Sequence, residues 1–407
     1  MQYRVDKKSG NRLSVLGLGC MRFPRNFAAI DMKKTEKIVM TAVENGVNYF
    51  DTAWMYPGSE EALGTALEKN GVRDDVFIAS KLPIALVKKT GDFDRFFNEE
   101  LSRLKTDRID YYLMHMLTDA ASWKSLVELG IEDWIAAKKK SGAIRQIGFS
   151  FHGIGEEFPA ILGLYPWEFC QIQYNYSDEN FQAGVRGLKR AAETMPVVIM
   201  EPLLGGKLAA GLPRQAAEIF REANLSAAPS DGSVPPGSAG FSPAGWGLRW
   251  VWNQAEAAVV LSGMNDPAQV LENAALARVT LPGSLSAAEL EVYRRVREAF
   301  NASCKIRCTG CGYCMPCPRN VNIPGCFAAY NTSFSMGRVI GWQQYMTSAA
   351  FTSARTFGPA NCVACGNCER RCPQNIPIIE SLVTLRRRME PLPFRIAVAG
   401  VRKFLGR

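Results

Sequence analysis

The chain has 407 residues, 47% of them hydrophobic, which predicts a globular protein of two domains with a large core. We expect neither a signal peptide nor a transmembrane segment. The first residues lack an apolar stretch, and no run reaches the roughly 18 apolar residues of a membrane span. The net charge of +9 is uneven, because residues 304–407 hold 14 Lys/Arg and 3 Asp/Glu while the rest balances at −2.

Short apolar runs recur along residues 1–285 and alternate with amphipathic segments. Each run has five to seven residues and is mostly apolar, as is typical of strands buried on both faces. The expected strands are Ser14–Leu18, Val47–Asp51, Val76–Lys81, Ile109–His115, Gln146–Ser150, Phe169–Gln173, Pro196–Met200 and Ala258–Ser262.

Helix signals separate these strands. A helix is expected over Thr35–Asn45, where Gly46 ends it, and Ser59 is a candidate N-cap for a helix that ends at Gly71. Eight successive βα units predict an α/β fold, a (β/α)8 TIM barrel. A doubly wound sheet is the weaker alternative, because no Gly-rich nucleotide fingerprint follows the first strand.

The remaining segments suggest the domain limits. Ser226–Pro243 is rich in Ser, Ala, Pro and Gly and is predicted to be a loop near the barrel mouth, and Ala287–Phe300 is predicted to be a helix that leaves the barrel. We therefore expect a barrel over 1–285, a small helical ferredoxin-like domain over 286–390 and a basic tail over 391–407.

Four polar residues lie at or just after the carboxyl ends of predicted strands: Asp51, Tyr56, Lys81 and His115. In a TIM barrel this end carries the chemistry. Asp51 and Lys81 close apolar strands, and mutual pairing would avoid the cost of unpaired buried charge. A lysine beside Tyr56 would lower the pKa of the phenol and make it a usable acid. The alternatives are a structural ion pair for Asp51 and Lys81, an ordinary loop aromatic for Tyr56 and a core histidine for His115.

Two cysteine runs dominate the last quarter of the chain. The first is Cys308, Cys311, Cys314 and Cys317-Pro318, and the second is Cys362, Cys365, Cys368 and Cys372-Pro373. Three cysteines at steps of three followed by Cys-Pro is the bacterial ferredoxin pattern for a [4Fe–4S] cluster. Four-cysteine zinc sites are the alternative.

The fourth cysteine of each run in two-cluster ferredoxins ligates the other cluster. The first cluster would therefore take Cys308, Cys311, Cys314 and Cys372, and the second would take the remaining four, Cys362, Cys365, Cys368 and Cys317. Cys304 and Cys326 are spare candidates should Cys317 be misplaced.

The basic excess coincides with the cysteine-rich part. Arginines offset the charge of an anionic cluster, and a basic surface would attract an acidic electron carrier such as ferredoxin or flavodoxin. Simple solubility is the alternative explanation. We expect no nucleic-acid partner, because no basic stripe with interleaved aromatics is present. Ten of the twelve cysteines follow residue 303, which favours cluster ligation in a reducing cytoplasm over disulfides.

Several motifs resemble the aldo-keto reductases. They are Gly17-Leu18-Gly19-Cys20-Met21, Asn48-Tyr49-Phe50-Asp51-Thr52-Ala53 with Tyr56, Ser80-Lys81, Asp110-Tyr111-Tyr112-Leu113-Met114-His115, Ile147-Gly148-Phe149-Ser150 and Glu272-Asn273. With the cysteine runs, the chain looks like the microbial branch of this family that carries a C-terminal 4Fe-4S domain. The resemblance implies hydride transfer between NADP(H) or NAD(H) and a carbonyl or alcohol substrate.

The resemblance also implies residue roles. Tyr56 would be the general acid, Lys81 and Asp51 would tune it, and His115 would orient the carbonyl. The cofactor would lie against Gly19, Cys20, Met21, Ser150, Gln171, Met200, Gly263, Gln269, Glu272 and Asn273.

The chain departs from the family at three places. Phe151 stands where an asparagine is usual, Met200 and Glu201 stand where a tyrosine would stack on nicotinamide, and Gln269 replaces an arginine that would bind the 2′-phosphate of NADP. The leading hypothesis is a reductase coupled to electron transfer through the clusters. The alternative is an electron-transfer protein that takes electrons from an external donor and whose barrel turns over no nicotinamide-dependent substrate.

Overall fold

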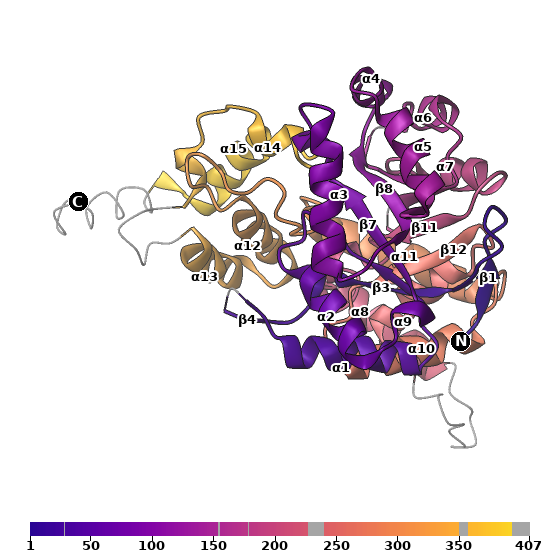
Figure 1. Ribbon diagram of the computed structural model, residues 1–407. Helices are drawn as coiled ribbons and strands as arrows, with labels where there is room; N and C mark the ends of the chain where they lie inside the picture. Colours follow the sequence, from indigo (N-terminus) through magenta and orange to yellow (C-terminus); the bar gives the residue numbers. More distant parts are fainter. Residues whose placement is uncertain (28, 154, 178, 227–239, 350–356, 393–407) are drawn as a thin grey trace. The chain divides into compact units, whose positions relative to one another are not determined.

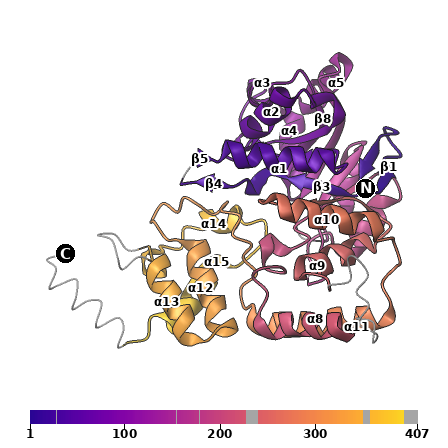
Figure 2. The ribbon, with the colours of Figure 1, turned by 90° about the horizontal axis from the view of Figure 1, so that it is seen from below.

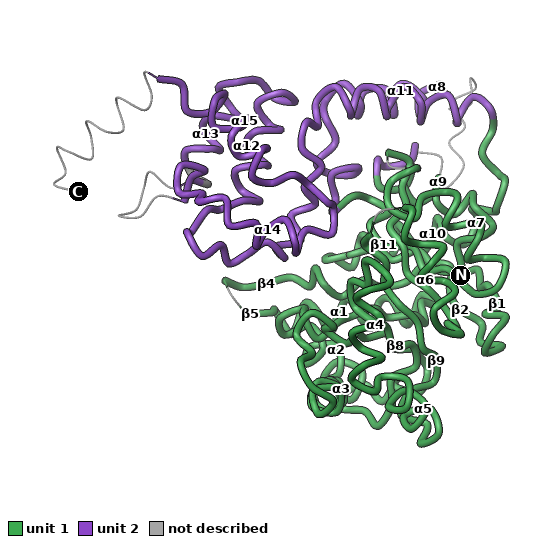
Figure 3. The backbone as a smooth tube through the Cα atoms, turned by 90° about the horizontal axis from the view of Figure 1, so that it is seen from above, with its two compact units in different colours: residues 1–204, 244–286 green, residues 205–243, 287–407 purple. Residues whose placement is uncertain are grey.

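The computed structural model describes residues 1–407 except 28, 154, 178, 227–239, 350–356 and 393–407. The chain divides into two compact units, residues 1–204 with 244–286 and residues 205–243 with 287–407 (Figure 3). The second unit thus includes 205–243, a segment that precedes the domain limit expected at residue 285.

A closed parallel barrel forms the centre of the first unit (Figure 1). Its strand order is β10-β11-β12-β3-β6-β7-β8-β9. The strands are β3 (Leu16–Gly19), β6 (Tyr49–Asp51), β7 (Phe77–Leu82), β8 (Ile109–Leu117), β9 (Ile144–Phe151), β10 (Phe169–Gln173), β11 (Val197–Met200) and β12 (Ala257–Ser262). All eight predicted strands are present, so the predicted (β/α)8 barrel is confirmed.

Helices follow the barrel strands in the alternation that the sequence predicts. Those of the first unit are α1 (Met32–Glu44), α2 (Ser59–Asn70), α3 (Gly91–Leu104), α4 (Ala120–Glu128), α5 (Ile131–Ser141), α6 (Phe158–Leu164), α7 (Gly184–Ala192), α9 (Pro243–Trp252, from its second residue) and α10 (Pro267–Val279). Asp31 caps α1 by accepting from Lys34 N–H, and Gly71 ends α2 with φ +66°.

Two short hairpins were not predicted. The strands β1 (Tyr3–Val5) and β2 (Arg12–Ser14) pair antiparallel, as do β4 (Arg25–Asn26) and β5 (Ala29–Ile30). The turn of the first hairpin is tied to the barrel, because Tyr111 Oη donates to Asp6 Oδ2 at 2.9 Å and Asn11 Nδ2 donates to Tyr111 Oη at 3.0 Å.

The barrel interior is filled by side chains that alternate along each strand. The inner cluster is Leu13, Tyr49, Ala79, Tyr111, Leu113, Phe169, Val198, Val259 and Leu261. Gly148 faces Phe169 so closely that an added Cβ would lie 2.4 Å from the Phe169 carbonyl oxygen, which leaves room only for glycine. Because the side-chain period is two, Asp51, Lys81 and His115 continue this inner face toward the carboxyl end.

The second unit is helical, as predicted. Its helices are α8 (Arg214–Ser226), α11 (Ala287–Ser303), α12 (Ile323–Ser335), α13 (Arg338–Ser348), α14 (Asn367–Arg370) and α15 (Ile378–Met389). The first two lie side by side (Figure 2). The parts predicted as a loop (Ser226–Pro243) and as a basic tail (391–407) fall largely outside the described residues.

A small apolar core holds the cysteine-rich part together. It includes Val321, Ile323, Phe327, Tyr345, Ile378, Leu382 and Leu385, and six cysteines of the two runs pack against it. The start of α12 is fixed by Asn322, whose Oδ1 accepts from Gly325 N–H at 3.1 Å. The core therefore holds the two runs beside the same helices.

Candidate functional site

Asp51 and Lys81 form a buried ion pair at the carboxyl ends of β6 and β7. Lys81 Nζ lies 2.7 and 2.8 Å from the two Asp51 carboxylate oxygens and also donates to the Thr52 carbonyl at 2.6 Å. Both side chains are almost fully buried. Burial raises the pKa of Asp51, and the nearby Lys81 ammonium opposes that rise. This is the pairing that the sequence predicted.

Tyr56 lies beside this pair in the turn between β6 and α2. The turn is fixed by Tyr56 N–H donating to the Ala53 carbonyl at 2.9 Å and by Ser59 N–H donating to the Tyr56 carbonyl at 3.0 Å. Lys81 Nζ is 5.1 Å from the centroid of the Tyr56 ring. The ammonium thus lies within cation–π distance of the Tyr56 ring.

Ser59 does not act as the expected N-cap. Gly58 holds that position with φ +74°, and no side chain caps the helix there. The Ser59 hydroxyl instead donates to the Cys20 carbonyl at 3.0 Å and lies 2.8 Å from Thr52 Oγ1. It thereby fastens the turn that carries Tyr56 to the end of β3.

His115 completes the group on β8. Its ring is edge-on to that of Tyr56, with 5.9 Å between centroids and an interplanar angle of 85°. Burial lowers the pKa of His115 well below its usual value, with further contributions from Lys81 and His152. A histidine that stays neutral can donate a hydrogen bond to a substrate oxygen without adding charge.

The candidate cofactor residues near the strand ends are held by local contacts. Ser150 is buried, and its Oγ accepts from Met116 N–H at 2.9 Å, while Cys20 is buried and Gly19 pairs in register with Asp51. Met21 is half-buried in the short 3-10 helix Cys20–Arg22 that follows. Met200 packs against the inner barrel cluster.

The remaining cofactor candidates lie after β12. Asn273 is buried, and its Nδ2 donates to Ser262 Oγ at 3.2 Å, whereas Glu272 is exposed. Gln269 Oε1 accepts from Asn265 N–H at 3.0 Å, so this side chain shapes the loop that begins at Gly263.

Gln171 offers the clearest test of whether the barrel fits a nicotinamide. It lies two residues after Phe169 in β10, so its side chain is on the same inner face. The side chain is 2% exposed, and within the described residues its Oε1 has no hydrogen-bond partner. Such an oxygen is costly to bury. An amide ligand such as a carboxamide would satisfy it, so the residues fit the group.

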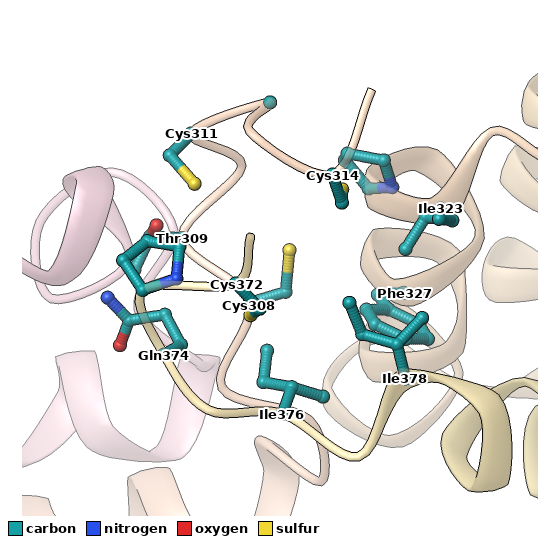
Figure 4. A pocket seen from close by; sticks show the side chains of 13 residues that line it. Cys308, Thr309, Cys311, Cys314, Ile323, Phe327, Cys372, Gln374, Ile376 and Ile378 are labelled. Atoms are coloured by element: carbon teal, nitrogen blue, oxygen red, sulfur yellow. The ribbon is translucent and has the colours of Figure 1, made fainter. Parts of the chain in front are cut away.

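Four cysteines from the two runs line one cavity. They are Cys308, Cys311, Cys314 and Cys372, the set predicted for the first cluster (Figure 4). Apolar side chains of Ile323, Phe327, Ile376 and Ile378 form much of the remaining wall. Burial raises the pKa of the Cys314 thiol to about 12, so ligation would have to displace its proton.

The four cysteines come from two segments of the chain. Their sulfurs border a space between the Cys308–Cys314 loop and the Cys372 segment. A cysteine-lined space between two loops fits an inorganic cluster.

The second run forms a loop at the surface. Cys365 is exposed, Cys362 and Cys368 are half-buried, and Ala364 N–H donates to Cys362 Sγ at 3.5 Å. Cys317, predicted as the fourth ligand of this run, packs with Cys362 and Cys368 on the same apolar core.

The spare cysteines have other surroundings. The Cys304 thiol donates to the Ile306 carbonyl at 3.6 Å, and Cys326 is fully buried in the apolar core. Neither lines the cavity.

Two residues near the barrel mouth were not singled out by the sequence. The Thr52 carbonyl accepts from Lys81, and a backbone acceptor gives no signal in a sequence. The alkyl chain of Arg22 lies over Gly263, where an added Cβ would be 3.1 Å from Arg22 Cδ. Its position after the Gly19-Cys20-Met21 motif was the only available hint.

Comparison with known proteins identifies both parts of the chain. Residues 15–288 match the model of the aldo/keto reductase family, and residues 307–376 match a 4Fe-4S dicluster domain. In the part of the chain that the structure describes, no helix is long and apolar enough to cross a membrane.

Curated relatives match over part of their length. An aldo-keto reductase of Bacillus subtilis, YhdN, is 28% identical over 46% of this chain and 57% of its own. One from Mycolicibacterium vanbaalenii is 32% identical over 38% of this chain and 50% of its own. The chain therefore spans little more than half the length of these relatives.

Solved structures share the fold. An aldo-keto reductase of Klebsiella pneumoniae in complex with NADPH has a TM-score of 0.57 at 23% identity, over 73% of this chain and 96% of that one. The holo form of an aldo-keto reductase from Bacillus halodurans has a TM-score of 0.55 at 23% identity, with the same coverage. At this identity the likeness concerns the fold alone.

Proposed function

We propose that this chain, which belongs to the aldo/keto reductase family, interconverts a carbonyl compound and its alcohol with a nicotinamide cofactor and carries two [4Fe–4S] clusters. The supporting observation is the convergence of a phenol, a buried ion pair and a neutral histidine at the carboxyl end of the barrel. That end is where barrels of this kind carry chemistry.

The residues divide the chemistry in a definite way. A bound nicotinamide supplies the hydride that reaches the carbonyl carbon. Tyr56 donates its phenolic proton to the carbonyl oxygen, and the Lys81 ammonium stabilises the phenolate left behind. Asp51 holds Lys81 in place, and His115 donates a hydrogen bond that orients the oxygen. In alcohol oxidation each transfer runs in reverse.

The cofactor would be NADP(H) or NAD(H). Gln171 would bind the carboxamide, and the other candidates would contact the rest of the molecule. The Klebsiella structure contains NADPH, which makes NADPH the first cofactor to test. Gln269 is engaged with Asn265, and its amide carries no charge for a 2′-phosphate, so NADH has to be tested beside it.

The cysteine runs would hold the clusters with crossed fourth ligands. Cys308, Cys311, Cys314 and Cys372 would ligate one, and Cys362, Cys365, Cys368 and Cys317 the other. Their chemistry is one-electron transfer. We propose that they exchange electrons with an external carrier, because a hydride carries two electrons and cubes pass them singly.

A second candidate is an electron-transfer protein with an idle barrel. The observations that favour it are Met200, which packs on the barrel core where a stacking aromatic is usual, and Phe151, which packs on Phe158. Both alter the expected nicotinamide surroundings.

The substitution Tyr56→Phe separates the two candidates. Under the first, carbonyl reduction falls by about 10²- to 10⁴-fold while NADPH binding, measured by fluorescence titration, is retained. Tyr3→Phe is the matched control, because Tyr3 lies in the first hairpin and its Oη donates to the carbonyl of Gly46, which follows α1. Equal turnover in the Tyr56 variant would refute the role of the phenol. Acid-labile sulfide and iron in anaerobically purified protein test the clusters, and zinc without sulfide would refute them.

A further inference from the structure

We propose that the surface segment Cys362–Arg371, which includes the short helix α14 and which we name the port loop, is the docking face for an acidic one-electron carrier protein. Electrons would pass between that carrier and the cluster of the second cysteine run. The inference rests on the proposed function in one respect, namely that this run holds a cluster.

The two cysteine runs differ in exposure. Cys365 is exposed, whereas the other eleven cysteines, all in the described part of the chain, are half-buried or buried. Val363 beside it is 55% exposed, and Ala364 is exposed too. The cavity of the first run is walled instead by isoleucine and phenylalanine side chains. Electron transfer between proteins falls off steeply with distance, so the exposed run is the better point of exchange.

The backbone of the port loop is shaped around its sulfurs. Ala364 has φ +54°, a conformation that disfavours residues with a Cβ, and its N–H donates to Cys362 Sγ at 3.5 Å. Hydrogen bonds to cluster sulfurs tune the reduction potential, as solvent exposure does. The port loop therefore combines both features at one cluster.

The charges of the port loop are positive and face solvent. Arg370 and Arg371 are both exposed, and within the described residues neither is paired with a carboxylate. The guanidinium of Arg370 lies over the turn, because a Cβ added at Gly366 would be 3.1 Å from Arg370 Nη1. Glu369, the one acidic residue of the port loop, is half-buried and accepts from Ile379 N–H at 2.8 Å.

Two other arginines of this unit, Arg386 and Arg388, make internal contacts. Arg388 lies 3.9 Å from the centroid of the Phe334 ring and donates to Ser333 Oγ, and Arg386 pairs with Glu390 at 3.0 Å. In the port loop, Arg370 donates to the Asn367 side-chain oxygen, and both arginines remain exposed to a partner. Two cations beside an exposed cluster complement a carrier with an acidic face, and such redox encounters are small, weak and sensitive to salt.

The test uses the double charge reversal Arg370→Glu/Arg371→Glu in cluster-loaded protein. The probe is a purified acidic two-[4Fe–4S] ferredoxin, reduced with dithionite and freed of excess reductant. In each transfer the probe loses one electron and a cluster of this chain gains it, with no proton. Stopped-flow absorbance gives the rate constant, and titration of the oxidised proteins gives the dissociation constant.

The matched control is Arg338→Glu/Arg387→Glu, which changes the net charge equally at two other exposed arginines of this unit. We expect the rate constant of the port-loop variant to fall, and its dissociation constant to rise, by about tenfold or more at low salt. The control should change little, and the difference should shrink near 1 M salt. In both double variants the iron content, the sulfide content and the rate of carbonyl turnover should match those of the parent protein.

Three outcomes would overturn the inference. Equal loss in both double variants would mean that only net charge matters. Unchanged constants in the port-loop variant would place the exchange elsewhere, while intact iron and sulfide would leave the proposed function standing. Protein without iron and sulfide would refute this inference together with the cluster part of the proposed function.

Discussion

The ammonium of Lys81 contacts both carboxylate oxygens of Asp51, at 2.7 and 2.8 Å, inside a barrel end from which water is largely excluded. If either residue is replaced, the buried charge of the other loses its partner of opposite sign. The pair therefore links the stability of the barrel to the proposed role of Tyr56, whose ring centroid is 5.1 Å from the same ammonium.

Breaking this pair should be costly. Asp51→Asn and Lys81→Met should each lower the free energy of unfolding by about 3–5 kcal/mol, because each leaves a buried group without its partner. The double variant should lose less than the sum of the two. Urea unfolding followed by tryptophan fluorescence measures all three, and strictly additive losses would contradict the buried pairing.

His115 predicts a pH dependence of stability. Burial lowers the pKa of His115 in the folded state, so below about pH 6.5 the unfolded chain binds a proton that the folded chain resists. Stability should be full above that pH and fall as the pH drops toward the lowered value. In His115→Gln this fall should be shallower, as melting temperatures across pH 5–7 would show. Identical slopes in variant and parent would count against a buried neutral imidazole.

Glu60 and Glu100 form a buried carboxyl pair outside the barrel, and this pair predicts that stability falls as the pH rises. Ser80 Oγ donates to Glu60 Oε1 at 2.6 Å and to Glu100 Oε1 at 3.2 Å. Burial raises the pKa of Glu100 well above its usual value, and the charge of Glu60 adds to the effect. The folded chain therefore keeps a proton that the unfolded chain releases near pH 4.5, and stability falls as pH rises through the raised pKa.

Glu100→Gln should flatten this loss. The variant should be more stable than the parent at pH 8, and the gain should shrink toward pH 5. Thermal melts at both pH values measure it. Glu99→Gln is the control, because Glu99 is half-buried, accepts from Trp54 Nε1 at 2.7 Å and pairs with Arg95 and Arg103 near the surface. A gain of the same size in the control would argue against the buried pair.

The crossed ligand set can be tested with cysteine variants. Cys372→Ser should reduce the iron content from about eight to about four atoms per chain, because it removes one ligand of the first cluster only. Cys326→Ser should keep its iron, since that thiol is buried in the apolar core away from the cavity. Loss of iron in both variants, or in neither, would contradict the assignment.

The barrel could be predicted because its strands are continuous apolar runs bounded by turn residues. The alternation inside those runs also places Asp51, Lys81 and His115 on one face, so the pairing of the first two followed from the cost of buried charge. The spacing of the cysteines likewise predicts that Cys372 joins the first run, and it lines the same cavity.

Other features give no periodic signal. The three-residue strand Tyr3–Val5 is largely exposed and too short to show alternation, and the Thr52 carbonyl that holds Lys81 is backbone. Ser59 carries the side chain of an N-cap, but its hydroxyl is used by Thr52 and Cys20. These details depend on tertiary contacts rather than on local sequence.

The hairpin turn that Asp6 ties to Tyr111 has a consequence for the order in which ligands bind. The amino end of the barrel is tied in this way and the interior is packed with side chains, so under the proposed function substrate and cofactor would both enter from the carboxyl end. Substrate and cofactor would then share one entrance, and the one that binds deeper would have to bind first and leave last. The closed amino end of the barrel, far from the proposed site, would thus impose an order of binding and release.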